Sequence, residues 1–187
     1  TPDTATLLGA PLSTGPAMDA CLAGRSEDLA RAADRLKLVS AHDALLLLRN
    51  CLSASKLLYT LRSARCAGHE LLQSFDDLQR SALGRICNVS LTDDQWLQAS
   101  LPVRMGGLGI RRVSSLALSA FLASAAGTLQ HQDHILSGTG VTSDIDFDQS
   151  LASRVQAAPQ GAAAGQQKEW DTPVIMAEFE ELRTRDS

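Results

Sequence analysis

The sequence predicts an all-α, mostly helical fold, and three observations support this fold class. Leucine and alanine supply most of the apolar residues, and both are strong helix formers. Aromatic residues make up only 4% of the chain, and the residues that favour strands are scarce. Apolar residues also recur at the spacing of an amphipathic helix. A chain of 187 residues, 44% of them hydrophobic, suits one ordinary domain with an appendage.

The first fifteen residues, 1–15, are expected to lead into the helices. Residues 5–12 are a short apolar run interrupted by Gly9 and Pro11, which predicts one short strand or an extended segment. No second strand is in view to form a hairpin with it, and a lone strand leaves its backbone groups unpaired. We therefore expect a loop here, or a strand whose sheet lies upstream.

About five core helices are expected. Ser40 followed by Asp43, and Thr92 followed by Gln95, resemble capping boxes and mark where two of the helices begin. Residues 101–110 are expected to be irregular, because a proline and three glycines disfavour any regular element there. The predicted helices cover residues 17–38, 41–63, 69–87, 92–100 and 114–130.

The composition of the chain changes near residue 135. Residues 1–135 hold 13 basic and 12 acidic residues, whereas residues 136–187 hold 4 basic and 9 acidic residues. The net charge of −4 therefore comes from the tail. We expect a helical domain over 16–135, a poorly ordered linker over 136–165, and a short acidic helix over 166–187. Whether that helix docks on the domain is left open by the sequence.

The four cysteines, Cys21, Cys51, Cys66 and Cys87, contain no C-x-x-C pair. No signal-peptide pattern opens the chain, and no uninterrupted apolar run approaches the roughly 18 residues of a membrane span. Free thiols in a reducing compartment fit this pattern best. We expect an intracellular protein, cytoplasmic or nuclear, without a membrane partner. Because the chain begins with Thr1, we also expect a fragment or a processed piece.

Three patterns suggest catalytic or metal sites, but each departs from the required spacing. Asp76-Asp77 follows Phe75 directly and lies in a helix-period stretch, so it predicts a solvated helix face rather than a polymerase metal site. The Asp144, Asp146 and Asp148 series lacks the glycine and the final glutamate of a calcium loop. Cys66 with His69, and His131 with His134, have no second ligand pair at zinc-finger spacing. We expect no catalytic residue, metal, cofactor or small-molecule substrate.

Two groups of basic residues are candidates for phosphate contacts. Residues 44–69 contain Arg49, Lys56, Arg62 and Arg65 and no acidic residue. Such a local positive stretch attracts phosphate even in an acidic chain, although charge alone favours an ordinary solvated helix face. The second group, Arg104, Arg111 and Arg112, flanks the glycine-rich turn at residues 106–109. That turn either packs Leu108 and Ile110 against the core or offers backbone amides to phosphate.

Residues 98–111, with the sequence QASLPVRMGGLGIR, and 117–124 resemble the P-x-x-x-G-G-L-G-I block that follows the catalytic core of non-LTR retrotransposon reverse transcriptases. Residues 7–12 resemble the strand that closes the palm, and residues 41–59 resemble the helix pair of the thumb. The resemblance spans roughly residues 7–130. It implies a non-catalytic thumb and connector segment whose basic stretch grips an RNA/DNA primer–template duplex, with the missing palm domain of the same polyprotein as partner. Neither the zinc knuckle of some relatives nor an endonuclease motif is present.

Three alternatives remain open on the sequence. The chain is a helical protein-interaction module if the leucine-rich residues 41–63 form a docking face. It is a decayed relic with no selected function if it comes from a truncated copy of such an element. An enzyme is the third alternative, and the missing site residues argue against it.

Overall fold

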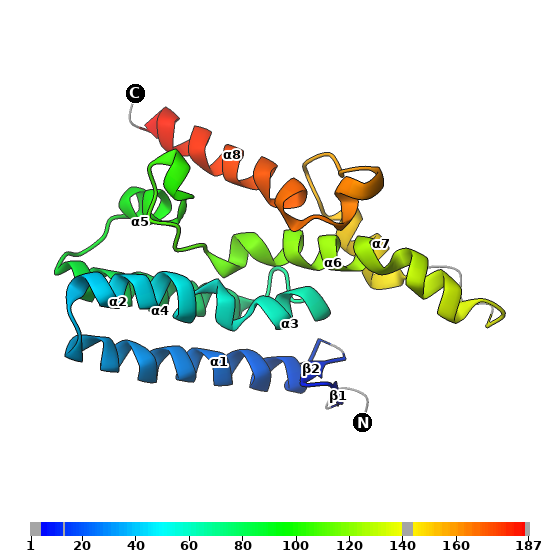
Figure 1. Ribbon diagram of the computed structural model, residues 1–187, viewed down its shortest axis with the longest axis horizontal. Coiled ribbons are helices and arrows are strands. Elements are labelled where there is room, and N and C mark those ends of the chain that lie inside the picture. The colour runs from blue at the N-terminus through cyan, green and yellow to red at the C-terminus, as the bar shows by residue number, and fades with distance from the viewer. Residues whose placement is uncertain (1–4, 13, 140–143, 186–187) are drawn as a thin grey trace.

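A computed structural model describes residues 5–12, 14–139 and 144–185. These residues are mostly helical, with one two-stranded sheet, so the predicted all-α class is confirmed. In Figure 1, α1 runs along one edge, α2 to α4 lie beside it, α6 follows, and α8 covers the opposite edge. The helices are α1 Pro16–Arg35, α2 Ala41–Leu47, α3 Leu58–Ser63, α4 Glu70–Cys87, α5 Asp93–Ser100, α6 Val113–Leu136, α7 Ile145–Ala152 and α8 Gln167–Arg185.

The lead-in forms a small hairpin, which corrects the expectation of a strand without a partner. Strand β1 (Thr6–Leu7) pairs antiparallel with β2 (Ala10–Pro11). The two residues between them, Leu8 and Gly9, both have positive φ, 51° and 83°. Two positive-φ residues in a two-residue loop make the tight turn that matches the twist of paired strands. Residues 1–4 and 13 of the predicted lead-in lie outside the described residues.

The expected helix over 41–63 is wrong as a single element. Helix α2 passes into a π turn at Leu48–Leu52, then a 3₁₀ turn at Ala54–Lys56, and only then does α3 begin. The break lies at Ser53, whose ψ of −138° is not helical and whose hydroxyl donates to the Arg49 carbonyl at 2.7 Å. Consequently the four basic residues of this stretch do not share one helical face.

Helix α4 begins close to the predicted residue, and its buried face contains Phe75 and, unexpectedly, Asp76. Asp76 is fully buried and accepts hydrogen bonds from the backbone N–H groups of Val113 at 2.7 Å and Ser114 at 3.1 Å. It thus caps the N-terminus of α6 from a different helix. The prediction of a solvated carboxylate pair holds for Asp77 and is wrong for Asp76.

The capping box at Thr92 and Gln95 is confirmed and begins α5. The following loop is irregular, as predicted, apart from one 3₁₀ turn at Val103–Met105. Gly107 is required there, because a Cβ atom would lie 2.0 Å from the carbonyl oxygen of Leu101. The loop therefore lies flat on α5 and buries Ile110 completely, while Leu108 stays partly exposed.

Helix α6 is the long central helix, and it continues past the predicted end at residue 130. By length and composition alone it qualifies as a membrane span, which the sequence analysis did not anticipate. Half of its most apolar 18-residue window is buried against other parts of the fold. Core helices pass the same test, so this is weak evidence for a membrane.

The tail has more regular structure than its composition predicts. Within the expected linker, residues 145–152 form α7 and Gly161–Gly165 form a 3₁₀ turn, while residues 140–143 lie outside the described residues. The predicted tail helix is α8, and it packs on α5 and α6. It buries Trp170, Ile175 and Leu182, whereas Phe179 is partly buried and Met176 remains exposed.

Candidate nucleic-acid interface

The structure divides the seven predicted phosphate-binding residues into two groups. The side chains of the first group are exposed and make no hydrogen bond or ion pair with any described residue; we call them the free cations, and they are Arg49, Lys56 and Arg104. The second group is bound to the chain's own C-terminal region; we call these the tail-bound arginines, and they are Arg62, Arg65, Arg111 and Arg112.

Arg49 lies against the glycine-rich loop. A Cβ atom on Gly109 would sit 3.2 Å from the Arg49 Nε atom and 3.7 Å from a methyl group of Val103. Gly109 has a φ of +74°, so glycine is favoured here both for its backbone conformation and for the close approach of the guanidinium. Arg104 belongs to the same loop. The loop that contains Arg104 and the π turn of residues 48–52 that contains Arg49, far apart in sequence, thus lie against each other.

Lys56 lies elsewhere, in a groove between α1 and residues 47–56. This groove also contains Arg31 and Arg35 of α1, which the sequence analysis missed. Their spacing of four residues places them on one helical face, and this was the available signal. Acidic residues at positions 27, 28 and 34 offset the positive charge of these two arginines in the sequence, so no local excess of basic residues is apparent.

Arg111 and Arg112 take part in a buried ion-pair cluster with α8. Arg111 donates to Asp171 at 2.8 Å and to Glu178 at 3.3 Å, and Arg112 donates to Glu178 at 2.7 Å. The side chains of Glu178 and Arg111 are only 7% and 15% exposed. The Nε atoms of both arginines are buried without a partner among the described residues. These two arginines are therefore not available to phosphate while α8 is docked.

The two carboxylates of this cluster respond differently to it. Burial raises the pKa of Asp171 and the charge of Glu178 adds to the rise, while the guanidiniums of Arg111 and, to a lesser extent, Arg154 only partly oppose it. Burial also acts to raise the pKa of Glu178, but a hydrogen bond from Ser115 and the charges of Arg112 and Arg111 outweigh it and lower the pKa. The ionised form of Glu178 is thus the one that the cluster stabilises.

Arg62 and Arg65 connect α3 to the tail at the surface. Arg62 donates to the Gln167 side chain at 2.7 and 3.0 Å. Arg65 donates to Gln149 and pairs with Asp146 at 3.6 Å. Both arginines retain exposed surface, so each contact is an exchangeable polar contact rather than a buried one.

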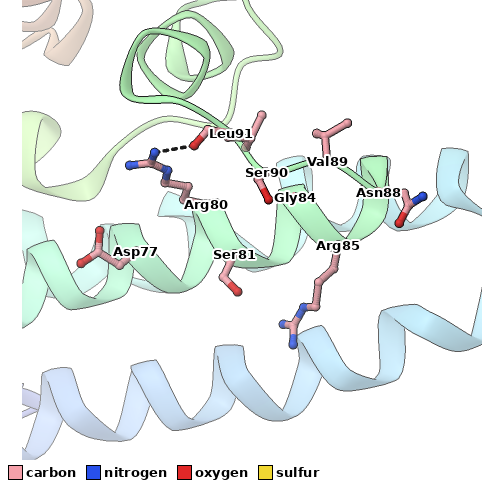
Figure 2. A pocket seen from close by; sticks show the side chains of 9 residues that line it. All are labelled: Asp77, Arg80, Ser81, Gly84, Arg85, Asn88, Val89, Ser90 and Leu91. Atoms are coloured by element: carbon pink, nitrogen blue, oxygen red, sulfur yellow. Dashed lines mark hydrogen bonds between the residues drawn. The ribbon is translucent and has the colours of Figure 1, made fainter.

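A hollow of about 550 Å³ lies at the C-terminal end of α4, over Asp77–Leu91. Figure 2 shows the Arg80 side chain directed toward Leu91 and the Arg85 side chain directed toward α1. Both guanidiniums are already engaged, Arg80 with Asp93 at 2.7 Å and Arg85 with Asp34 at 3.6 Å. Among the described residues, neither Ser81 nor Ser90 of the lining is hydrogen-bonded to a base, and we assign the hollow no chemistry.

Three residues of the rejected metal patterns have structural roles. Asp144 caps α7 by accepting from the Phe147 N–H at 3.0 Å, and Asp146 pairs with Arg65. His69 caps α4 through Leu71 N–H and contacts Asp19 at 2.9 Å. Within the described part of the chain, no three His, Cys, Asp or Glu side chains are grouped to hold a metal ion.

Comparison of the chain with protein-family models, with curated proteins and with solved structures finds no match in any of the three.

Proposed function

We propose that this chain is a helical, non-catalytic segment of a reverse-transcriptase-like retrotransposon protein that binds an RNA–DNA primer–template duplex beside a palm domain. The observation that carries the proposal is the set of free cations, Arg49, Lys56 and Arg104, exposed beside the glycine-rich loop and the α1 groove. The resemblance of the loop block and of residues 41–59 to that family supports the same reading.

The free cations have no carboxylate partner among the described residues, although the chain carries a net charge of −4. Paired cations on this molecule, such as Arg25, Lys37 and Arg183, neutralise nearby carboxylates and offer little to an anion. The free cations have no such competitor, so a phosphate that approaches them replaces water only. Neutralising three phosphates releases about three condensed counterions, which predicts that affinity falls by about 40-fold when salt rises fourfold.

The test is fluorescence anisotropy of a labelled RNA–DNA hybrid titrated with the chain at about 50 and about 200 mM salt. The variant Arg49→Ala/Lys56→Ala/Arg104→Ala is expected to lose most of the affinity and most of the salt dependence. The matched control Arg25→Ala/Lys37→Ala/Arg183→Ala removes the same charge from paired positions and is expected to bind nearly as well as the parent. A folded parent chain that binds no hybrid, or equal losses in the two triple variants, would overturn the proposal.

A second candidate function rests on exposed leucines near α2. Leu38 is 84% exposed, and Leu46 and Leu47 are 42% and 40% exposed. Each offers exposed apolar surface to a partner protein, as the docking residues of a helical interaction module would. Binding through this face is insensitive to salt, so the same salt comparison separates the two functions.

A further inference from the structure

The groove between α1 and residues 47–56 combines an apolar floor with a positive rim. Its volume is about 430 Å³, and its apolar lining comes from Ala32, Leu36, Leu47 and Leu52. Leu36 is almost fully buried, Leu47 is 40% exposed, and Leu52 is intermediate. A ligand in the groove therefore meets accessible hydrocarbon as well as charge.

The rim of the groove has an excess of positive charge that the protein does not neutralise. Arg31, Arg35 and Lys56 line the groove, and the only acidic residue in its lining is Asp28. Asp28 is already paired with Arg31 and lies 3.7 Å from Arg25. The side chains of Arg35 and Lys56 make no hydrogen bond or ion pair with any described residue.

The acidic neighbour of Arg35 is directed away from the groove. Asp34 pairs with Lys37 at 3.1 Å and with Arg85 of α4 at 3.6 Å. Both contacts lower the pKa of Asp34, the Lys37 hydrogen bond most of all. Asp34 and Arg35 are therefore adjacent in sequence but do not pair with each other. The Asp34 carboxylate pairs with Lys37 and with Arg85 of α4, while the Arg35 guanidinium lines the groove.

A floor of hydrocarbon beside unneutralised cations suits an unpaired nucleotide. Its base offers a flat face to the leucines and to a guanidinium plane, and its phosphate offers charge to the rim. A duplex keeps its bases stacked inside and presents phosphate only, so it leaves the apolar floor unused. An acidic peptide supplies the charge without the flat apolar surface.

We propose that this groove binds an unpaired nucleotide of single-stranded nucleic acid, with the base on Leu47 and Leu52 and the phosphates at Arg35 and Lys56. The inference rests on the proposed function for the class of ligand and adds to it the kind of strand and the place of contact. A single-strand site next to the duplex-binding loop suits a segment that meets the unpaired part of a template.

Cys51 lines the groove, is exposed and is a free thiol, so it reports on occupancy without any mutation. Cys87 is also exposed and free but does not line the groove, and it serves as an internal control. Alkylation of both cysteines is followed by mass spectrometry with and without an oligouridine of about ten nucleotides, a typical length for single-strand sites. At an oligonucleotide concentration ten times Kd, Cys51 alkylation is expected to slow by about tenfold and Cys87 alkylation to stay unchanged.

Charge reversal identifies the residues that hold the strand. Arg35→Glu/Lys56→Glu is expected to abolish the protection of Cys51, whereas Arg183→Glu/Arg185→Glu, an equal change at exposed paired positions of α8 outside the groove lining, retains it. The inference is overturned if neither cysteine is protected, or if both are protected equally. It is also overturned if polyglutamate protects Cys51 as well as the oligouridine does.

Hybrid anisotropy on the same preparations keeps the two proposals apart. Hybrid binding that depends on Arg49 and Arg104, together with an unprotected Cys51, retains the proposed function and rejects the single-strand groove. Protection of Cys51 by oligouridine from a chain that binds no hybrid retains the groove and rejects the duplex-binding function.

Discussion

The free cations and the tail-bound arginines come from the same kind of sequence pattern but differ in what surrounds them. In the sequence, each lies in a stretch with few acidic neighbours. In the fold, Arg111 and Arg112 meet carboxylates that lie 60 to 67 residues further along the chain. Arg49 and Arg104 meet none among the described residues. Whether a basic residue is available to a ligand is therefore decided by tertiary contacts rather than by its local charge.

The comparison also shows that the acidic tail has a structural role. Part of its negative charge pairs with the helical domain, because Asp146, Asp171 and Glu178 each form an ion pair with an arginine there. Buried ion pairs of this kind add little net stability relative to apolar packing, but losing one partner leaves a charge that burial penalises. We therefore expect the two groups to separate into residues that hold the fold together and residues that bind.

The largest expected effect is from Glu178→Ala, which removes the carboxylate shared by Arg111 and Arg112. Two guanidiniums are then left buried with only Asp171 nearby, and we expect the free energy of unfolding to fall by about 3 kcal/mol or more. Urea denaturation followed by circular dichroism measures it. Glu180→Ala is the matched control, since Glu180 is on the same helix in an exposed pair with Arg183 and its loss is expected to cost less than about 0.5 kcal/mol. Similar losses in the two variants would show that the cluster does not hold α8.

A smaller effect is expected in the pH dependence of stability. Because the pKa of Glu178 is lowered from its ordinary value of 4.5, its contribution is present above that pH and is lost as the pH falls through the folded-state pKa. The raised pKa of Asp171 has the opposite sign, and since burial is its largest cause, most of that effect is common to the parent chain and to Glu178→Gln; the part that comes from the Glu178 charge is lost in the variant. The melting temperature of the parent should exceed that of Glu178→Gln at neutral pH, and the gap should close in acid below 4.5. A gap that is constant with pH contradicts the assignment.

The smallest effect is expected at the surface contact between Arg62 and Gln167. Arg62→Ala removes two exposed hydrogen bonds to one side-chain oxygen, and we expect a loss of only about 0.5 kcal/mol. Thermal unfolding measures the loss, and Gln167→Ala should give the same value because it removes the same contact. The double variant should be no less stable than either single variant. Additive losses would mean that each residue has a separate role.

The helices that the sequence located well begin with local signals. The start of α5 follows from the reciprocal capping box at Thr92, and α4 follows from a regular apolar spacing that ends in a left-handed Asn88. The interruption at Ser53 had no such signal, because residues 41–63 contain neither proline nor glycine. A serine hydroxyl that bonds to a carbonyl of the preceding turn is compatible with either a continuous or a broken helix.

The role of Asp76 also could not be predicted from local sequence. Its position in α4 was predictable, but its function depends on the N-terminus of α6, 37 residues away in sequence. In the candidate interface, too, local charge identified some residues and tertiary contacts were needed for others. Arg49 and Lys56 were found from charge, whereas Arg35 was missed because only the fold shows that Asp34 faces another helix.

The positions of the two tryptophans give the molecule a separate optical signal for each of its parts. Trp96 lies in the main helical core, while Trp170 lies in the cluster formed by α6, α7 and α8. Trp170 is fully enclosed, its indole N–H donates to the Ala164 carbonyl, and the Arg154 guanidinium lies 5.0 Å from its ring. Since the chain has no other tryptophan, fluorescence distinguishes loosening of the tail from melting of the core.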